Sequence, residues 1–192
     1  MKFRTEIELK AWSTPLEYSH KILCLGSCFA TNIAEELSRR KFHVTSSPTG
    51  ILFNPASIAL AMQLMSEGDV PDVKELIEVD GRYLHYNYHS SLGGDTPQGA
   101  VSRIYEALQS GRRALHEADI TIVTLGTAWV YRLCDSGAVV ANCHKQPQRN
   151  FRRELLTVEE CVTYLERIVS YTSGRVLFTV SPVRHVGEGL ED

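Results

Sequence analysis

The sequence predicts an α/β fold in which helices cover both faces of a parallel or mostly parallel sheet. Three short apolar runs, KILCLG (21–26), ITIVTLG (120–126) and RVLFTV (175–180), have the form of strands buried on both faces. Segments with apolar residues at helical spacing separate these runs. A chain of 192 residues favours a single domain, and two hairpin patterns interrupt it as insertions.

The first half of the chain begins with the strand over 21–26, which leads through a Gly-Ser-Cys loop into a helix over 29–40. The run FHVTS (42–46) is the next expected strand. Asn54 followed by Pro55 is typical of a helix start, so we expect a helix that runs to residue 65. The side chains at helical spacing in these helices are Phe29, Ile33, Ala34 and Leu37, then Ile58, Met62 and Met65.

The second half contains both hairpin patterns. Asp80-Gly81 favours a type I′ turn in a hairpin over 76–89, and a second hairpin over 129–142 turns at Asp135-Ser136-Gly137. Thr96-Pro97 starts one helix, and Thr157 with Glu160 forms a capping box for another. The apolar residues on these two helices are Val101, Ile104, Tyr105, Leu108 and Leu115, then Val162, Leu165, Ile168 and Val169.

Composition excludes several classes of protein. With 20 Lys and Arg against 23 Asp and Glu, the net charge of −3 gives no global attraction to nucleic acid, so we expect no nucleic-acid partner. The basic stretch over 145–154 is interpreted as a solvated loop. No apolar run approaches the roughly 18 residues of a membrane helix, so we expect no membrane partner, and residues 1–12 do not resemble a secretory signal.

The cysteines and histidines indicate a reducing compartment and no metal. Five cysteines is an odd number, and no pair has C-x-x-C spacing, so we expect a cytoplasmic protein with free thiols. Cys24 and Cys161 lie among apolar residues, where a free cysteine usually packs as a small hydrophobe. Among the seven histidines only His85 and His89 have H-x-x-x-H spacing, and both fall in the first hairpin pattern. We therefore expect no metal and no cofactor.

The candidate chemistry follows the predicted strands at their carboxyl ends, where ligands bind in open α/β sheets. The first strand ends in Gly26-Ser27-Cys28 and the middle strand in Gly126-Thr127. The last is followed by SPVRH (181–185), which contains Arg184 and His185. We expect these loops to converge on one edge of the sheet.

The loop after the first strand contains two potential nucleophiles at a helix N-terminus. Unpaired amides and the helix dipole favour negative charge there, whether on a thiolate or on a developing oxyanion. The alternative interpretation is that Ser27 caps the helix and Cys28 packs against it.

Residues 26–30 read GSCFA, and the chain resembles the GSCFA family, which is grouped with the SGNH (GDSL-like) hydrolases. The resemblance extends from about residue 22 to the C-terminus. It includes GILFNPASI (50–58), Tyr88-His89-Ser90, LGTAWVY (125–131), NCHK (142–145) and SPVRH (181–185). The resemblance implies a three-layer α/β/α, flavodoxin-like fold, a bacterial origin and an acyl-ester hydrolase.

The SGNH pattern implies a nucleophile in the first loop and an oxyanion hole around it. Aligned without gaps on Gly-Asp-Ser, Cys28 takes the place of the nucleophile, whereas a loop shifted by one residue would present Ser27. Gly50 corresponds to the oxyanion glycine of the second motif. Ala128 replaces the asparagine of the third, and Asn142 is the first candidate to supply the missing donor. Asn54 and Thr127 complete this group of candidates for oxyanion or substrate binding.

The family's base comes from an Asp-x-x-His segment, which these 192 residues do not contain. We therefore expect a single domain, 1–192, that lacks its C-terminal portion. Without that portion, we expect an apolar strand edge that is exposed, or that a second copy covers in a homo-oligomer. Within the sequence, His185 is the best candidate for the base, and Arg184 beside it is a candidate substrate contact.

Other histidines are weaker candidates. His144, beside Cys143 and Lys145, is either a substrate-loop residue or an ordinary polar loop residue. His85 and His89 lie in the first hairpin pattern with Tyr83, Tyr86 and Tyr88. Those aromatic residues can line a sugar or acyl pocket, although hairpin aromatics usually pack across strands.

Three functions remain open. The first is an SGNH-like hydrolase acting on an acyl ester, for which an O-acetylated carbohydrate is one expected substrate. The second is a non-catalytic module on the same fold that binds a carbohydrate or an anion. The third, a redox protein centred on Cys28, is less favoured because no second cysteine has a convincing resolving position.

Overall fold

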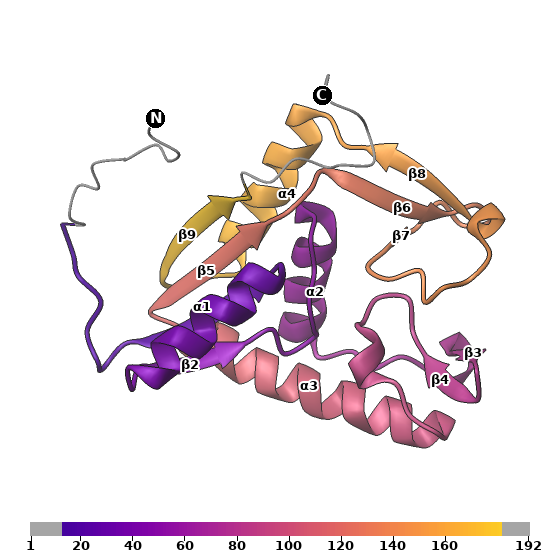
Figure 1. The fold of residues 1–192 in the computed structure, drawn as a ribbon, viewed down its shortest axis with the longest axis horizontal. Helices are drawn as coiled ribbons and strands as arrows, with labels where there is room; N and C mark the ends of the chain where they lie inside the picture. The colour runs from indigo at the N-terminus through magenta and orange to yellow at the C-terminus, as the bar shows by residue number, and fades with distance from the viewer. Residues whose placement is uncertain (1–12, 182–192) are drawn as a thin grey trace, which may run out of the picture.

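A four-stranded parallel sheet forms the centre of the molecule (Figure 1). The structure is a computed structural model that describes residues 13–181. The strands lie in the order β2-β1-β5-β9, with β1 at Lys21–Gly26, β2 at His43–Ser46, β5 at Ile120–Leu125 and β9 at Arg175–Val180. All neighbouring pairs are parallel. The predicted strands and the predicted fold class are confirmed.

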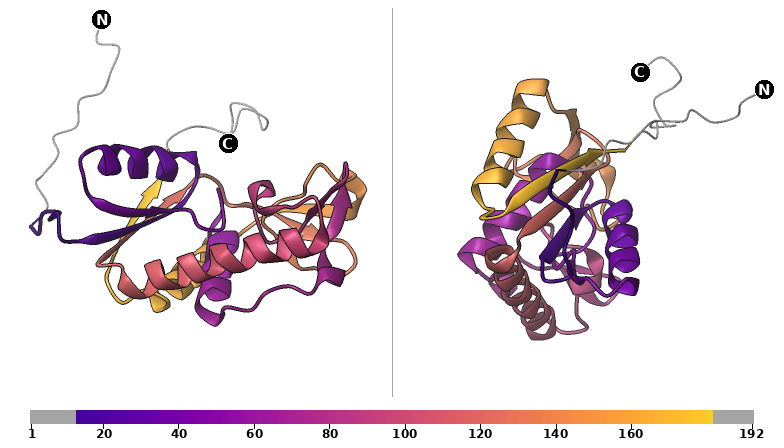
Figure 2. Two further views of the ribbon diagram at one scale, coloured as in Figure 1. Left: turned by 90° about the horizontal axis from the view of Figure 1, so that it is seen from below. Right: turned by 90° about the vertical axis from the view of Figure 1, so that its left-hand side faces the viewer.

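Helices cover both faces of this sheet and make it the middle of three layers. Helix α1 (Cys28–Arg39) lies on one face, and α2 (Pro55–Glu67), α3 (Pro97–Glu117) and α4 (Val158–Ser170) lie on the other (Figure 2). Successive side chains of β1 point to opposite faces, so Ile22 and Cys24 pack toward α1, whereas Leu23 and Leu25 pack toward the other helices. The core of the fold is these two apolar layers.

The predicted helix starts are confirmed by their hydrogen bonds. The Asn54 side chain accepts from the Ser57 N–H at 2.8 Å, and the Thr96 hydroxyl accepts from the Gly99 N–H at 3.1 Å. In the α4 capping box, Thr157 accepts from the Glu160 N–H at 3.2 Å, and the Glu160 carboxylate accepts from the Thr157 N–H at 2.8 Å. Each cap satisfies donors that the helix itself leaves unpaired.

The first hairpin is confirmed but is shorter than predicted. Strands β3 (Ile77–Val79) and β4 (Arg82–Leu84) pair antiparallel, and Asp80 (φ 50°) and Gly81 (φ 74°) have the positive φ angles of a type I′ turn. Residues 85–89 leave the hairpin after β4. The prediction that they lie on it is wrong, because this segment instead contacts the loops at residues 49 and 141–144.

A separate three-stranded antiparallel sheet follows β5. The predicted hairpin forms β6 (Trp129–Leu133) and β7 (Val139–Val140), and β8 (Phe151–Leu155) pairs with the other edge of β6. Strand β8 includes part of the basic stretch, so its interpretation as a solvated loop is wrong there. Strand β6 supplies the backbone partners, and burial of Phe151 adds apolar stabilisation. Three short 3₁₀ helices, η1 (Val73–Glu75), η2 (Ser90–Leu92) and η3 (Gln148–Asn150), complete the described elements.

Several apolar side chains at helical spacing are not in the core. Phe29 is 50% exposed and Tyr105 is 49% exposed, whereas Ala30 and Ala34 occupy the part of α1 closest to the sheet. Val162 and Val169 of α4 are also exposed. Strand β9, predicted to be buried, is only half-buried because within residues 13–181 it pairs with β5 alone. The core-facing stripe of α1, α3 and α4 is therefore narrower than the apolar pattern of each of these helices.

Candidate active site

The sheet has a switch point between β1 and β5. The chain passes from β1 to β2 in one direction across the sheet and from β5 to β9 in the other. In open α/β sheets ligands bind at such a point, outside the carboxyl ends of the strands. The two loops that leave it are Gly26-Ser27-Cys28 and Gly126-Thr127.

The first loop buries Ser27 and exposes Cys28. The Ser27 N–H donates to the Thr124 hydroxyl at 2.9 Å and to its carbonyl at 3.1 Å, and the two hydroxyl oxygens lie 2.9 Å apart. Ser27 is the backbone N-cap of α1, but its side chain makes no capping hydrogen bond. Gly26 permits this contact, since a Cβ atom there would lie 2.1 Å from the Thr124 carbonyl oxygen.

Cys28 is the first residue of α1 and its side chain is exposed. The amides of Cys28 and Phe29 lie in the first turn, where the helical ladder offers no acceptor. The first turn contains no acidic side chain to compete for them. The loop therefore presents a thiol beside backbone donors, which is an arrangement suited to a nucleophile that generates an oxyanion.

A loop over 47–54 bridges the two central strands. The Leu52 N–H donates to the Gly26 carbonyl at 2.8 Å. The Phe53 carbonyl accepts from the Gly126 N–H at 2.8 Å and the Thr127 N–H at 3.1 Å. These bonds hold the residues around Asn54 against the end of β5.

On the β5 side of this bridge lies a cavity of about 570 Å³, which we call the aromatic cavity. Three predicted site residues, Asn54, Thr127 and Asn142, line it. The other lining residues in the described part of the chain are Phe53, Gly126, Trp129, Tyr131, Val140, Ala141, Cys143, Gln146, Gln148 and Phe151. The second sheet contributes much of this wall through β6, β7 and the start of β8.

The three predicted residues share one hydrogen-bonding pattern. The Asn54 Oδ1 accepts from the Ser57 N–H at 2.8 Å, the Thr127 Oγ1 from the Trp129 N–H at 3.0 Å, and the Asn142 Oδ1 from the His144 N–H at 2.8 Å. A backbone N–H can only donate, so each oxygen is committed as an acceptor. The two amide NH₂ groups and the Thr127 hydroxyl hydrogen are left as donors.

A second cavity, of about 780 Å³, lies on the other side of the bridge and is called the α1 groove. Gly50 and His89 line it, together with Thr31, Glu35 and Ser38 of α1. Ala34, Arg39, Ser46, Ser47, Ile51 and Ser91 complete its described lining. Cys28 shares the helix face of Thr31, Glu35 and Ser38 because these positions recur at intervals of three and four. Cys28 therefore lies on the helix face that lines the groove, one turn before Thr31, but is not itself one of the described lining residues.

Gly50 and His89 are closely packed. Gly50 has φ 93°, and a Cβ atom on it would lie 2.1 Å from the His89 Cβ. The Gly50 N–H already donates to the Ser47 carbonyl at 2.8 Å, so it is not a free oxyanion donor here. The His89 Nδ1 accepts from the Ser91 N–H at 3.2 Å, which leaves the proton of a neutral ring on Nε2.

His144 lies behind the wall of the aromatic cavity, where its N–H donates to the lining residue Asn142. Its side chain is buried, and Nε2 donates to the His85 carbonyl at 2.9 Å. Within residues 13–181 its buried Nδ1 has no hydrogen-bond partner. Burial lowers the pKa of His144, and it also lowers the pKa of His85 despite the nearby Glu75 carboxylate. His144 (φ 47°) and Lys145 (φ 57°) have left-handed backbones, which are strained for residues with side chains.

Arg184 and His185 lie outside the described residues, so their convergence on this edge stays a prediction. The sequence did not predict the aromatic and glutamine residues that line the aromatic cavity. The sequence predicts Trp129 and Tyr131 as residues of the second hairpin, and it places Gln146, Gln148 and Phe151 in the basic stretch interpreted as a solvated loop. The alternation that places Trp129, Tyr131 and Phe151 on one side of the second sheet depends on the β6–β8 pairing.

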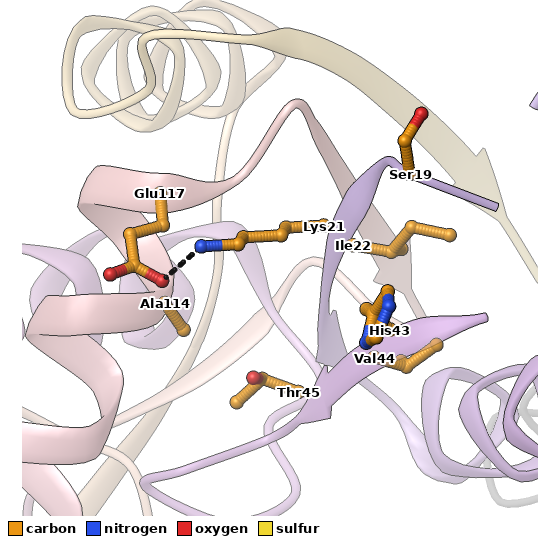
Figure 3. Close-up of a pocket in the computed structure, with 8 residues that line it drawn as sticks. All are labelled: Ser19, Lys21, Ile22, His43, Val44, Thr45, Ala114 and Glu117. Atoms are coloured by element: carbon orange, nitrogen blue, oxygen red, sulfur yellow. Dashed lines mark hydrogen bonds and ion pairs between the residues drawn. The ribbon is translucent and has the colours of Figure 1, made fainter. Parts of the chain in front are cut away.

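A cavity of about 360 Å³ lies at the other end of the main sheet, where the strands begin (Figure 3). Lys21 and His43, at the amino ends of β1 and β2, line it. The Lys21 ammonium pairs with the Glu117 carboxylate at 2.9 Å. Because it is at the amino ends of the strands, this cavity is not where a parallel sheet places its ligand site.

Residues 13–181 contain no cluster of three His, Cys, Asp or Glu side chains able to hold a metal. Among the helices of that same range, none is both long and apolar enough to cross a membrane.

Comparison with known proteins identifies the family. The sequence model of the GSCFA family matches residues 21–192. The chain belongs to the GSCFA family. No curated protein and no solved structure matches it. In this GSCFA chain the motif that names the family forms the end of β1 and the first turn of α1, at the switch point of the sheet.

Proposed function

We propose that this GSCFA protein is an acyl-ester hydrolase in which Cys28 is the nucleophile. The observation that carries the proposal is the exposed Cys28 thiol at the N-terminus of α1. This helix follows β1, which pairs with β5, the strand that leads into the Gly126-Thr127 loop. Ser27 is the less suitable nucleophile because its hydroxyl is buried against Thr124. The placement of the family among the SGNH hydrolases is part of this proposal.

In the proposed reaction, the Cys28 sulfur attacks the ester carbonyl. The new carbon–sulfur bond forms as the carbonyl oxygen becomes an oxyanion, which then collapses and expels the alcohol. The thiol proton passes to an imidazole, for which His185 is the predicted residue, and then to the departing alkoxide. Water attacks the resulting thioester, releases the acid and returns a proton to the thiol.

The oxyanion requires preorganised donors. The amides of Cys28 and Phe29 are candidates, and the side chains of Asn54, Thr127 and Asn142 are further ones. The side-chain oxygens of Asn54, Thr127 and Asn142 accept from backbone N–H groups. These three side chains therefore do not need to reorient during the reaction. Asn142 thereby supplies an amide donor in a chain that has Ala128 where the SGNH pattern has asparagine.

The test compares Cys28→Ala with Ser27→Ala in hydrolysis of p-nitrophenyl acetate. Cys28→Ala is expected to lower kcat by roughly a thousandfold or more, as loss of a nucleophile does. Ser27→Ala should retain kcat within about tenfold, because it removes one buried hydrogen bond. Cys134→Ala, which removes another exposed thiol, is the matched control. Full activity of Cys28→Ala would overturn the assignment of the nucleophile.

A non-catalytic binding module is the second candidate. Two cavities near the carboxyl ends of the main-sheet strands favour it. The exposed Cys28 also favours it, because no imidazole within residues 13–181 is described as its partner. Thermal-shift measurements on the unmodified protein separate the candidates. A ligand that raises the melting temperature of a protein with no ester turnover would support the binding module.

A further inference from the structure

The aromatic cavity has a distinctive composition. Among the described residues that line it, none carries a formal charge. Four of them are aromatic (Phe53, Trp129, Tyr131 and Phe151) and four carry a carboxamide (Asn54, Asn142, Gln146 and Gln148). The α1 groove, by contrast, contains Glu35 and Arg39. The described lining residues of the aromatic cavity therefore offer no charged side chain to pair with a charged ligand, although the Arg153 guanidinium lies over one of them, Trp129.

The aromatic side of the cavity is held rigid. The Arg153 guanidinium lies over the Trp129 ring, 3.7 Å from its centroid. The Phe151 ring packs edge-on against Tyr86, with ring centroids 5.7 Å apart and an interplanar angle of 85°. A fixed aromatic surface offers contact area at little cost in conformational entropy.

The carboxamide side supplies hydrogen bonds in both directions. The Asn54 and Asn142 amides are donors, since their oxygens are occupied. Gln146 and Gln148 add side chains that can both donate and accept. A hydrocarbon chain in this cavity would leave these groups desolvated and unpaired, which is costly.

We infer that the aromatic cavity binds a neutral carbohydrate, which is the alcohol part of the ester; this inference rests on the proposed function. A sugar ring has an apolar C–H face suited to an aromatic surface and hydroxyl groups that both donate and accept hydrogen bonds. The cavity volume of about 570 Å³ falls in the range of roughly 300–1,000 Å³ typical of small-molecule sites. The sugar would lie beside β5 and present its ester toward the Cys28 loop.

The test measures sugar binding in the absence of turnover, in the full chain carrying Cys28→Ala. Saturation-transfer NMR and titration calorimetry are performed with methyl glycosides of glucose, galactose, mannose, xylose and N-acetylglucosamine. Glucuronate and glucosamine serve as anionic and cationic counterparts. We expect at least one neutral glycoside to bind, and we expect it to bind at least tenfold more tightly than the charged sugars.

Variants locate the binding. Trp129→Ala and Gln146→Ala are each expected to weaken it at least fivefold, and circular dichroism verifies that they fold. Tyr105→Ala and Gln98→Ala are matched controls on the exposed surface of α3 and should leave binding unchanged. Gln146→Ala also keeps the test valid if Trp129→Ala fails to fold.

The outcomes separate this inference from the proposed function. Absence of binding by every neutral glycoside, or binding that neither Trp129→Ala nor Gln146→Ala weakens, would overturn the carbohydrate site. Preferential binding of a charged sugar would also overturn it. Ester hydrolysis by a protein that binds no sugar would leave the proposed function standing alone. Sugar binding by a protein without hydrolysis would leave only the carbohydrate site.

Discussion

The aromatic cavity and the α1 groove lie at the same edge of one sheet, but their walls have different chemistry. The groove is formed by a helix face and a tight loop, and it contains hydroxyl groups, an imidazole and charged side chains. The cavity is formed largely by a second, antiparallel sheet, and the described residues that line it are uncharged. The carboxyl ends of the main sheet thus position both cavities, whereas the inserted strands give the aromatic cavity its uncharged wall.

The difference also extends to how each cavity is held in shape. Close backbone packing at Gly50 shapes the groove, and hydrogen bonds to Asn142 and His144 shape the wall of the cavity. Substitutions at these positions should therefore damage one cavity and spare the other.

Gly50→Ala should have the largest effect and should act on the groove. The new Cβ atom would overlap the His89 Cβ, and the φ angle of 93° is unfavourable for alanine. We expect a loss of about 3 kcal/mol in the free energy of unfolding, measured by urea denaturation. Gly81→Ala is the matched control, because its φ is 74° but no atom lies within 4 Å of the added Cβ. A loss no greater than that of the control would contradict the packing argument.

Asn142→Asp should act on the cavity alone. The aspartate can still accept from the His144 N–H, but it removes the NH₂ donor and adds a negative charge where the oxyanion is proposed to form. If the proposed function holds, kcat for p-nitrophenyl acetate should fall by about a hundredfold. Unfolding measurements should show little change in stability. Unchanged kcat would exclude Asn142 as an oxyanion donor.

Removal of the Ser27 hydroxyl should have a smaller effect, and it should act on the loop between β1 and α1. Ser27→Ala breaks the contact with the Thr124 hydroxyl, and we expect a loss of about 1 kcal/mol in unfolding free energy. A double-mutant cycle with Thr124→Val isolates the coupling between the two side chains. Additive effects of the two substitutions would show that the hydroxyl–hydroxyl contact contributes nothing.

Acidification should have the smallest effect on stability, and that effect should arise from the histidines behind the wall of the aromatic cavity. Burial holds the pKa of His144 and of His85 below the ordinary value of 6.5. The unfolded chain therefore binds protons first, so stability is fully present above about pH 6.5 and declines as the pH falls toward the folded-state pKa. Urea denaturation at pH 8 and pH 5.5 measures the decline. His144→Asn should reduce the pH dependence, and an unchanged dependence would rule out His144 as its source.

Much of the fold was predictable because its signals are local. The apolar strands, the caps at Asn54, Thr96 and Thr157, and the Asp80-Gly81 turn each depend on residues close in sequence. Of the candidate site, the loops at the ends of β1 and β5 followed from the same signals combined with the rule for parallel sheets. The expectation that the chain lacks a C-terminal portion, and the roles of Arg184 and His185, stay predictions.

By itself the sequence determined the parallel α/β core, its helix starts and the strand ends from which candidate site residues come. The tertiary structure alone decided that Ser27 turns inward to Thr124 while Cys28 is exposed. It also decided the pairing of β8 with β6 and the division of the candidate residues between two cavities. Strand and helix patterns arise from local backbone and side-chain preferences, but the direction of a loop side chain and the partner of an edge strand depend on residues brought together only by folding.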